Sequence, residues 1–283
     1  MGEINVKNLR KLAFIGGGNM AVALIGGLVK RGLSPTHILV SDPSEEQRER
    51  LRREHGVGTT DANGEAARGA DVIVLAVKPQ QMRAAVLALE LATTALDATP
   101  LFISVAAGIP HAALARWLPA DAPIVRAMPN RPALYGHGAT GLFAPGSVTH
   151  AERSLSESIL AAVGTVVWVE QETQMDTVTA LSGSGPAYFF AFMEALQAAA
   201  QARGLPEEIA RRLTLSTALG AARMALDSPE SLATLREQVT SKGGTTAAAL
   251  TVLDAANLRG IVAQAVAAAD SRSAELAAEY GIP

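Results

Sequence analysis

The sequence of 283 residues lacks cysteine altogether, is poor in aromatic residues (4%) and has no large excess of charge of either sign. Without cysteine the chain can form no disulfide, no thiolate nucleophile and no cysteine-ligated zinc or iron–sulfur site. The 24 lysines and arginines nearly balance the 27 aspartates and glutamates, giving a formal net charge of −3. This balance predicts no basic surface for nucleic acid or an anionic membrane, and we expect a cytoplasmic protein.

Long apolar segments are also lacking, although 49% of the residues are apolar. Glycine, proline or a charged residue interrupts every run before the roughly 18 residues that indicate a membrane-spanning helix. The N-terminal segment MGEINVKNLRKL has no apolar stretch of the kind found in a secretory signal, and we expect none. No H-E-x-x-H or paired spacing predicts a metal site among the five histidines, which are His37, His55, His111, His137 and His150.

The first half of the chain alternates short apolar runs with helical patterns, which is typical of βαβ units on a parallel sheet. The run Val72–Val77 is apolar at every position, as expected for a central strand that is covered on both faces. The predicted strands are Lys11–Ile15, His37–Ser41, Asp71–Val77, Leu101–Val105, Ile124–Met128, Gly141–Phe143 and Thr165–Val169.

After about Glu170 the strand patterns end and helix-length segments follow, separated by glycine and proline. These predicted helices are Pro186–Arg203, Pro206–Leu226, Thr246–Ala256 and Leu258–Glu279. We therefore predict an α/β chain with a Rossmann-type dinucleotide-binding domain over residues 1–170. An all-α domain is predicted over residues 171–283.

Alanine and leucine occur nearly all round these later helices, as in Ala265–Ala269 and Ala247–Leu250. A helix that is apolar on all faces must be covered on all faces. A small domain cannot enclose several such helices by itself, so we expect a partner chain to cover some of them. A homodimer is the simplest closed arrangement.

The segment Lys11–Ala21 reads KLAFIGGGNMA and places Gly16, Gly18 and Ala21 in the pattern G-x-G-x-x-G/A. The first glycine permits a tight turn, the second lets backbone amides approach a pyrophosphate, and the small third residue allows close packing of helix on strand. The segment follows a predicted strand and opens a helix within a βαβ unit, which is the context that a dinucleotide site requires. We expect the cofactor to contact Ile15, Gly16, Gly17, Gly18, Asn19 and Met20.

Asp42 ends the second predicted strand, where an acidic residue commonly binds the hydroxyls of the adenosine ribose. A carboxylate at this place should repel a 2′-phosphate, whereas the hydroxyls of Ser41 and Ser44 could donate to one. Arg48 and Arg50 could assist, although a solvated helix face is the better interpretation of the charged run Glu45–Glu54. NADH and NADPH both remain open on this reasoning.

Four further segments, together with the glycine loop, resemble the pyrroline-5-carboxylate reductases: Ala76-Val-Lys-Pro79, Arg126-Ala-Met-Pro-Asn130, Leu181-Ser-Gly-Ser-Gly-Pro-Ala-Tyr188 and Val239-Thr-Ser-Lys-Gly-Gly-Thr-Thr246. Their order and spacing agree over nearly the whole chain. The last segment is the most specific, because a Ser-x-Gly-Gly-Thr-Thr turn entering a helix is rare outside this family. Two positions depart from the family's pattern: Arg131 replaces a small hydroxyl residue, and Lys242 replaces a common proline.

This resemblance implies an enzyme that reduces L-1-pyrroline-5-carboxylate to L-proline with NADPH or NADH, the last step of proline biosynthesis. It also implies a Rossmann-type domain followed by a helical domain that interlocks with its mate in a dimer, and some family dimers form larger rings. The resemblance places the cofactor along Asn63, Ala76, Val77, Lys78, Pro79, Val105, Ala106 and Ala107. Lys78 could act as a catalytic acid, but the simpler interpretation is a lysine in a loop that faces the cofactor.

The substrate of this family carries one carboxylate, and the start of a predicted helix offers backbone amides to bind it. Ser241 could add a hydroxyl donor, and the Thr246 hydroxyl could hydrogen-bond the ring nitrogen and help to relay its proton. Ser184 is expected to line the nicotinamide end of the site. The substrate-binding set is therefore Ser184, Ser241, Gly243, Gly244, Thr245 and Thr246, with Thr246 as the catalytic residue.

Two alternatives stay open at this point. One is a related reductase, such as another cyclic-imine reductase or a β-hydroxyacid dehydrogenase; the latter would place a lysine on the long interdomain helix, and Pro186–Arg203 contains none. The other is a regulatory protein that binds a nicotinamide cofactor without turnover. Such a sensor needs the glycine loop but has no use for the Ser-Lys-Gly-Gly-Thr-Thr turn.

Overall fold

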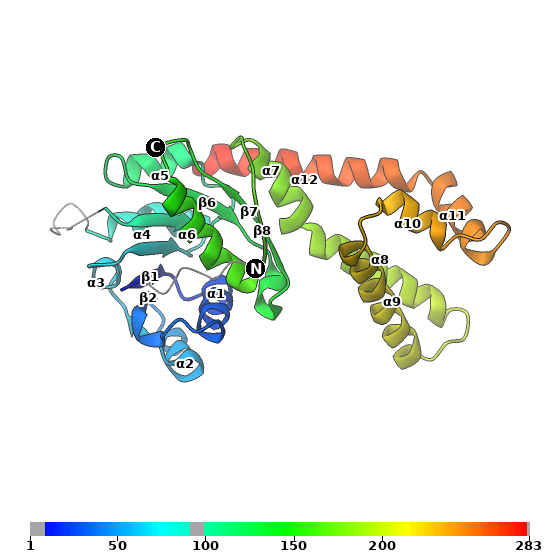
Figure 1. The fold of residues 1–283 in the computed structure, drawn as a ribbon, viewed down its shortest axis with the longest axis horizontal. Helices are drawn as coiled ribbons and strands as arrows, with labels where there is room; N and C mark the ends of the chain where they lie inside the picture. The colour runs from blue at the N-terminus through cyan, green and yellow to red at the C-terminus, as the bar shows by residue number, and fades with distance from the viewer. Residues whose placement is uncertain (1–8, 91–98, 282–283) are drawn as a thin grey trace. The chain divides into compact units, whose positions relative to one another are not determined.

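The protein forms two compact units in a computed structural model that describes residues 9–90 and 99–281 (Figure 1). The first unit runs to Ser184 and also includes the C-terminal segment from Ala268, and the second comprises Gly185–Ala267. Most of the N-terminal segment in which we expect no secretory signal lies outside the described residues.

The first unit is built on one eight-stranded sheet with the strand order β3-β2-β1-β4-β5-β6-β7-β8. Neighbouring strands pair in parallel except for β6 and β7, which are antiparallel. The order 3-2-1-4-5-6 is that of a dinucleotide-binding Rossmann sheet. The strands are β1 (Leu12–Ile15), β2 (Ile38–Ser41), β3 (Gly58–Thr60), β4 (Val72–Leu75), β5 (Leu101–Ser104), β6 (Ile124–Met128), β7 (Gly138–Phe143) and β8 (Gly164–Trp168).

Helices connect these strands and cover both faces of the sheet, as parallel strands require. The α-helices of this unit are α1 (Asn19–Lys30), α2 (Glu45–His55), α3 (Asn63–Ala67), α4 (Met82–Leu87), α5 (His111–Trp117), α6 (His150–Leu160) and α7 (Gln174–Val178). Short 3-10 segments are η2 (Pro35–His37), η3 (Pro79–Gln81), η4 (Arg131–Tyr135) and η5 (Ala161–Val163), and a π-helical turn, η6, spans Thr179–Gly183.

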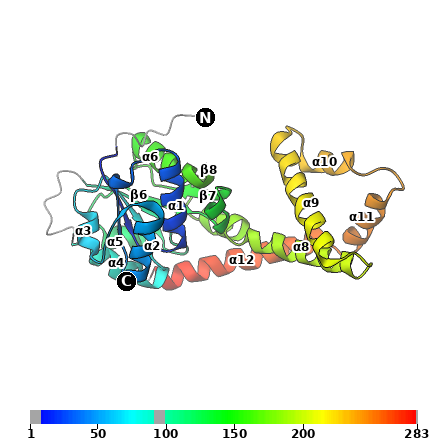
Figure 2. The ribbon, with the colours of Figure 1, turned by 90° about the horizontal axis from the view of Figure 1, so that it is seen from below.

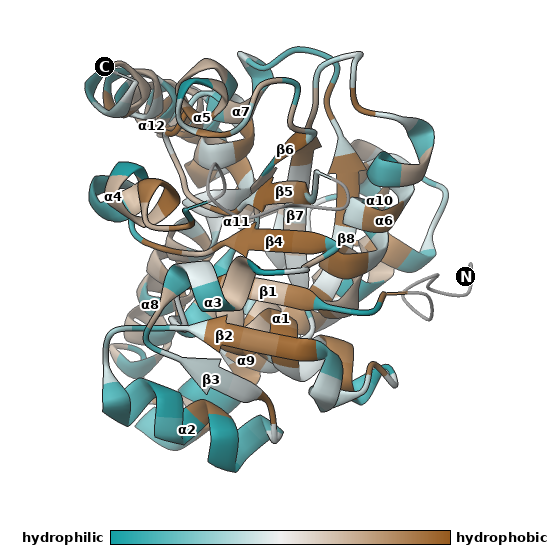
Figure 3. Ribbon diagram, turned by 90° about the vertical axis from the view of Figure 1, so that its left-hand side faces the viewer, coloured by the Kyte–Doolittle hydropathy of each residue, from teal (hydrophilic) through white to brown (hydrophobic). Residues whose placement is uncertain are grey.

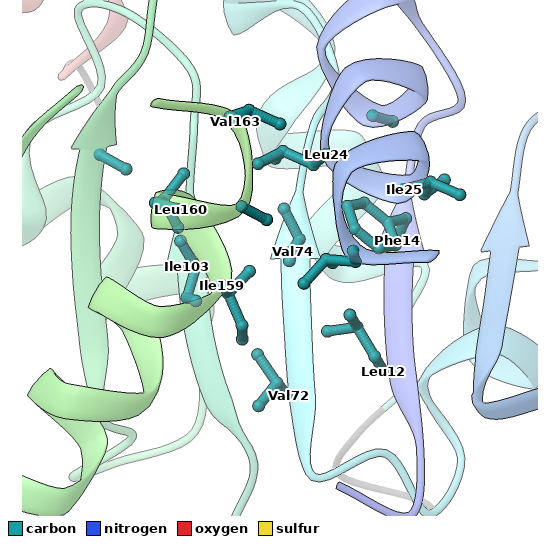
Figure 4. Close-up of a cluster of buried hydrophobic side chains, with 14 of the residues drawn as sticks. Leu12, Phe14, Leu24, Ile25, Val72, Val74, Ile103, Ile159, Leu160 and Val163 are labelled. Carbon is teal, nitrogen blue, oxygen red and sulfur yellow. The ribbon is translucent and has the colours of Figure 1, made fainter. Parts of the chain in front are cut away.

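Side chains alternate between two hydrophobic clusters, one on each face of the sheet. Leu12 and Phe14 of β1 join the cluster formed with α1, α6 and η5, which Figure 4 shows in close-up. Ala13 and Ile15 of the same strand join the opposite cluster, with α3, α4 and α5. All four residues of β4 are fully buried, which confirms the prediction of a central strand from its unbroken apolar run. Figure 3 shows β1, β2 and β4 in hydrophobic colours beside the hydrophilic α2.

The compact units divide at Ser184, whereas the sequence places the domain boundary near residue 170. The difference arises because residues after β8 still pack on the sheet: Val178 of α7 lies against Gly141 of β7. The end of the last helix also belongs to the first unit, where the Ser273 hydroxyl donates to Asp176 at 2.7 Å. A single cut in the chain therefore cannot describe both compact units.

The second unit is entirely helical among its described residues and comprises α8 (Gly185–Gln201), α9 (Glu207–Asp227), α10 (Leu232–Gln238), α11 (Thr245–Ala255) and the first part of α12 (Leu258–Tyr280) (Figure 2). Four of these helices match the predicted ones closely. Large apolar side chains lie exposed on them, including Phe189 (70%), Leu219 (72%) and Val252 (68%). Such a surface is typical of an interface with another chain.

No single helix in the described part of the chain is both long and apolar enough to span a membrane. The helices α11 and α12, which meet at a bend of 53°, reach the required length and hydropathy only when they are taken together.

Gly164 begins β8 at a point where only glycine fits. Its φ of 155° lies in a region that side-chain-bearing residues rarely adopt, and an added Cβ would lie 2.0 Å from the carbonyl oxygen of Gly138 on β7. We expect Gly164→Ala to lower the free energy of unfolding by about 2–4 kcal/mol, because both the backbone and the β7–β8 contact must shift.

Thermal unfolding followed by circular dichroism, at one fixed protein concentration, checks this expectation. Gly146→Ala is the matched control, because Gly146 is exposed and an added Cβ there has no neighbour within 4 Å. Equal melting temperatures for the two variants would contradict the role assigned to Gly164.

Candidate active site

The glycine loop lies at the carboxyl end of β1 and turns directly into α1. Gly16 has a φ of 95°, and its amide donates to the Ser41 carbonyl oxygen at 2.8 Å. Gly18 is the N-cap residue of α1, and no side chain caps the amides of the first turn. These uncapped amides, at the positive end of a helix dipole, form an anion site of the kind that binds a pyrophosphate.

Gly16 and Gly18, the two glycines of the G-x-G pattern, serve different purposes in this loop. A Cβ on Gly16 would lie 2.8 Å from the carbonyl oxygen of Ala76, so the close approach of β1 and β4 excludes a side chain there. A Cβ on Gly18 would meet nothing within 4 Å, because Gly18 lines a cavity of about 980 Å³. The open space beside Gly18 fits a ligand that approaches the backbone, as a dinucleotide pyrophosphate does.

The cavity gathers residues from the ends of β1, β2 and β4, which is where a Rossmann sheet binds its ligand. Eight of the residues predicted to bind the cofactor line it: Gly16, Gly18, Ser41, Asp42, Asn63, Ala76, Val77 and Lys78. The other predicted residues do not line it: Ile15, Gly17, Asn19, Met20, Pro79, Val105, Ala106 and Ala107. Of these, Ile15 is fully buried in the core, and Val105 to Ala107 directly follow β5.

Asp42 is fixed by two backbone amides at the end of β2. Its Oδ2 accepts a hydrogen bond from the Gly17 amide at 2.8 Å, and its Oδ1 accepts one from the Ser44 amide at 2.9 Å. The carboxylate thereby ties the glycine loop to the start of α2. Gln47 of α2 reinforces this tie by donating its side-chain amide to the carbonyl oxygen of Gly17.

Asn63 has a structural task that its sequence position did not indicate. Its Oδ1 accepts a hydrogen bond from the buried Ser41 hydroxyl at 2.7 Å, and its Nδ2 donates to the Ala85 carbonyl oxygen at 3.0 Å. Asn63 therefore links the end of β2 to α4 across the floor of the cavity.

Sequence reasoning missed the rest of the cavity lining. Apart from Pro43, which follows β2, it comes from the segment after β3 and from η3, α4 and the residues that follow α4: Pro43, Asp61, Ala62, Gly64, Glu65, Arg68, Gln80, Gln81, Ala84, Ala85, Ala88 and Glu90. No motif marks these residues: the pairing of β3 beside β2 brings one group to the site, and the other group follows β4. Within the described ranges, no group of three or more His, Asp or Glu residues could hold a metal ion.

The segment Arg126-Ala-Met-Pro-Asn130 supplies two buried connectors. The Arg126 guanidinium donates to Glu172 at 2.6 Å, and the backbone amide of His111 donates to the same carboxylate oxygen at 2.6 Å. Burial lowers the pKa of the His111 imidazole, while the Glu172 carboxylate opposes this effect. These two hydrogen bonds to Glu172 link β6 and the start of α5 to the segment after β8.

Asn130 positions the turn that carries Ser184. Its Nδ2 donates to the Ser182 carbonyl oxygen at 2.8 Å, and its Oδ1 accepts from the Ala139 amide at 2.9 Å. The Ser184 amide in turn donates to the Thr179 carbonyl oxygen at 2.9 Å, which completes the π-helical turn η6. The Leu181–Tyr188 segment is thus a hydrogen-bonded turn that leads into α8. Arg131, by contrast, is exposed at the start of η4.

The predicted substrate turn is a tight turn into α11, in the second unit. The Gly244 amide donates to the Ser241 carbonyl oxygen at 3.0 Å, and Gly243 has a φ of 72°. A Cβ on Gly244 would lie 2.4 Å from the Ser241 Oγ, so a side chain there would require the Ser241 hydroxyl to rotate away. Gly244 is the N-cap residue of α11, and no side-chain hydrogen bond caps that helix.

This geometry narrows the set of amides available for an anion. The Gly244 amide is already used within the turn, which leaves the amides of Gly243, Thr245 and Thr246 as the donors of the prediction. Thr246 is half-buried in the first turn of α11, whereas Ser241, Lys242 and Thr245 are exposed.

A Rossmann sheet with a dinucleotide cavity, joined to a helical unit with an exposed apolar surface, defines a nicotinamide-dependent oxidoreductase with a dimerisation domain. The family described as pyrroline-5-carboxylate reductase dimerisation matches residues 172–276, and one described as NADP oxidoreductase coenzyme F420-dependent matches residues 11–108. The pyrroline-5-carboxylate reductase of Pseudomonas aeruginosa is 49% identical over 271 residues, 96% of this chain and 98% of the relative. The chain belongs to the pyrroline-5-carboxylate reductase family.

Solved structures agree with this assignment over nearly the full length. A pyrroline-5-carboxylate reductase from Coxiella burnetii is 45% identical, with a TM-score of 0.90 over 95% of this chain and 99% of that chain. The pyrroline carboxylate reductase of Plasmodium falciparum, solved with NADP bound, is 29% identical, with a TM-score of 0.82 over 96% and 99% of the two chains. The resemblance predicted from the sequence motifs is therefore confirmed.

Proposed function

We propose that this chain reduces the C=N bond of L-1-pyrroline-5-carboxylate to give L-proline, the last step of proline biosynthesis. The observation that carries the proposal is the presence, in one chain of this family, of a dinucleotide cavity at Gly16 and Gly18 and a Ser-Lys-Gly-Gly-Thr-Thr turn at a helix start. The nicotinamide cofactor, when bound, supplies the hydride. The residues of the chain then have to bind, orient and protonate the substrate.

Eight cavity-lining residues are proposed to hold the cofactor. The amides at the start of α1 would bind its pyrophosphate, and Asp42 would accept hydrogen bonds from ribose hydroxyls. The segment Ala76 to Lys78 would run along the cofactor at the end of β4. The other eight predicted residues remain proposed contacts with the cofactor.

The substrate carboxylate is proposed to bind the free amides of Gly243, Thr245 and Thr246, with a further donor in the Ser241 hydroxyl. Glycine at position 243 allows the left-handed turn, and glycine at 244 leaves room for the Ser241 side chain. A helix start stabilises a bound anion through its dipole and its unsatisfied amides. Lys242 is exposed in the same turn and adds a positive charge next to the proposed carboxylate site.

Thr246 is the proposed catalytic residue. Its hydroxyl would hydrogen-bond the imine nitrogen, orienting the C=N bond and relaying the proton that the ring nitrogen gains on reduction. Ser184, at the end of the η6 turn, is the remaining proposed contact at the reacting end.

The oligomer is part of the proposal as well. The dimerisation family match and the exposed apolar side chains of α8, α9 and α11 support a homodimer in which a second copy covers these helices. By function, residues 1–170 are the proposed cofactor domain and residues 171–283 the proposed dimerisation and substrate domain, a division that differs from that of the compact units. The proposed location is cytoplasmic.

The purified protein should oxidise NADH or NADPH when pyrroline-5-carboxylate is added, and should produce proline in equal amount. The loss of reduced-nicotinamide absorbance and the quantity of proline formed measure this directly. A small 3-hydroxy acid offered with the oxidised cofactor is the control for a β-hydroxyacid dehydrogenase and should give no turnover. Cofactor binding without any turnover of the imine would favour the sensing alternative instead.

A further inference from the structure

We propose that the cavity of this chain favours NADH over NADPH, and that the Asp42 carboxylate is the group that rejects the 2′-phosphate. This inference rests on the proposed cofactor site but concerns a choice that the sequence leaves open. Four features of the described residues carry it: the fixing of Asp42, the engagement of nearby arginines, the orientation of Ser41 and the charge of the cavity wall.

The position of the Asp42 carboxylate is set by the protein before any ligand binds. Hydrogen bonds from the amides of Gly17 and Ser44, at 2.8 and 2.9 Å, hold both carboxylate oxygens at the mouth of the cavity. Rotation away from a 2′-phosphate would break both hydrogen bonds and leave Gln47 to hold the glycine loop against α2. The negative charge therefore stays where the adenosine ribose of a dinucleotide lies in Rossmann sites.

The arginines of α2 are occupied by other partners. Arg48, with a side chain only 12% exposed, donates to the Asp42 carbonyl oxygen at 2.6 Å and to the Glu45 carboxylate. Arg52 donates to Glu45 at 2.6 Å, and Arg50 forms an ion pair with Glu54 at 3.1 Å. Recruiting any of these guanidinium groups to a phosphate would break an existing charge-assisted hydrogen bond. None of the three lines the cavity.

The nearby hydroxyls offer few donors. Ser41 is fully buried and its hydroxyl already donates to the Asn63 Oδ1 at 2.7 Å. Ser44 caps α2, where its Oγ accepts a hydrogen bond from the Gln47 amide at 3.3 Å, so it has a single hydroxyl hydrogen to donate. Neither residue supplies the cluster of donors that a phosphate requires.

The charge of the cavity wall adds to the same preference. Its acidic residues, Asp42, Asp61, Glu65 and Glu90, outnumber its basic residues, Arg68 and Lys78. A phosphate monoester brings between one and two further negative charges at neutral pH. Like charges in a partly enclosed site repel more strongly than in bulk water, whereas ribose hydroxyls can donate to the Asp42 carboxylate.

Binding measurements on the intact protein, without substrate, test the inference. Isothermal titration with NADH and with NADPH should give a Kd about tenfold or more lower for NADH. Asp42→Asn keeps the size of the side chain, removes its charge and leaves one of its two acceptor oxygens; affinity for both cofactors should change, and the two Kd values should come within about threefold of each other. Glu49→Gln removes the same charge from an exposed site on α2 outside the cavity and should leave the Kd ratio unchanged.

A salt series on the unaltered protein gives an independent reading in case Asp42→Asn does not fold. Raising the ionic strength should narrow the Kd ratio, because screening weakens the repulsion of the 2′-phosphate. Equal affinities, or tighter binding of NADPH, would overturn the inference while leaving the proposed reductase intact. Binding of NADH in preference, without reduction of pyrroline-5-carboxylate, would instead overturn the proposed function alone. Failure of the folded protein to bind either cofactor would overturn both.

Discussion

Thr246→Ala should lower kcat/KM for pyrroline-5-carboxylate by about 10²–10³-fold, with the Kd of the cofactor changed by less than about twofold. The expected loss follows from removing one hydroxyl that both orients the imine and relays its proton. The turn that presents this hydroxyl should survive, because its geometry depends on backbone groups: the Gly244 amide bonds the Ser241 carbonyl oxygen, and no side-chain hydrogen bond caps α11.

Three companion variants separate the hydroxyl from the rest of the side chain. Thr246→Ser keeps the hydroxyl and should retain most of the activity, whereas Thr246→Val keeps the shape and should be as impaired as the alanine variant. Thr251→Ala is the matched control: this exposed threonine lies on the same helix, and its hydroxyl only donates to the Ala247 carbonyl oxygen at 3.0 Å. Parallel losses of imine turnover and cofactor affinity in Thr246→Ala would identify Thr246 as structural.

The strands and helices that sequence reasoning found are those whose pattern is local. The unbroken apolar run at β4 and the glycine loop can each be recognised within about a dozen residues, and both occur as predicted. The missed elements are short and carry little apolar signal: β3 is the three-residue edge strand Gly58–Thr60, and α10 is a seven-residue helix with no buried residue. Packing and strand pairing, not propensity, stabilise such elements.

The same distinction between local pattern and long-range contact applies to the residues of the site. Residues that follow predicted strands, such as Asp42 and Ala76, line the cavity because parallel strands end at one edge of a sheet. The tie from Asn130 to Ser182 spans 52 residues, and that from Arg126 to Glu172 spans 46, so no local pattern could reveal either. The occupied amide of Gly244 was equally hidden, because turn geometry decides which amides a ligand can use.

Gly16 and Gly18 differ in what a methyl group would disturb, and this difference yields the second large expected effect. Gly16→Ala should weaken NADH binding by about 100-fold or more and also lower the melting temperature. Its added Cβ would lie 2.8 Å from the Ala76 carbonyl oxygen, and alanine tolerates a φ of 95° poorly. The clash moves β1 against β4 and with them the amides at the start of α1.

Gly18→Ala should leave the melting temperature within about 1 °C of the unaltered protein, because its Cβ meets no neighbour within 4 Å. Binding of NADH should nevertheless weaken by about 10–100-fold, since the methyl group takes the space through which a pyrophosphate reaches the amides of α1. Thermal unfolding and NADH titration of both variants, with Gly146→Ala as the common control, measure the two effects separately. Unchanged affinity in Gly18→Ala would mean that the cofactor binds elsewhere in the cavity, because no ligand could pass so close to that backbone without meeting the added carbon.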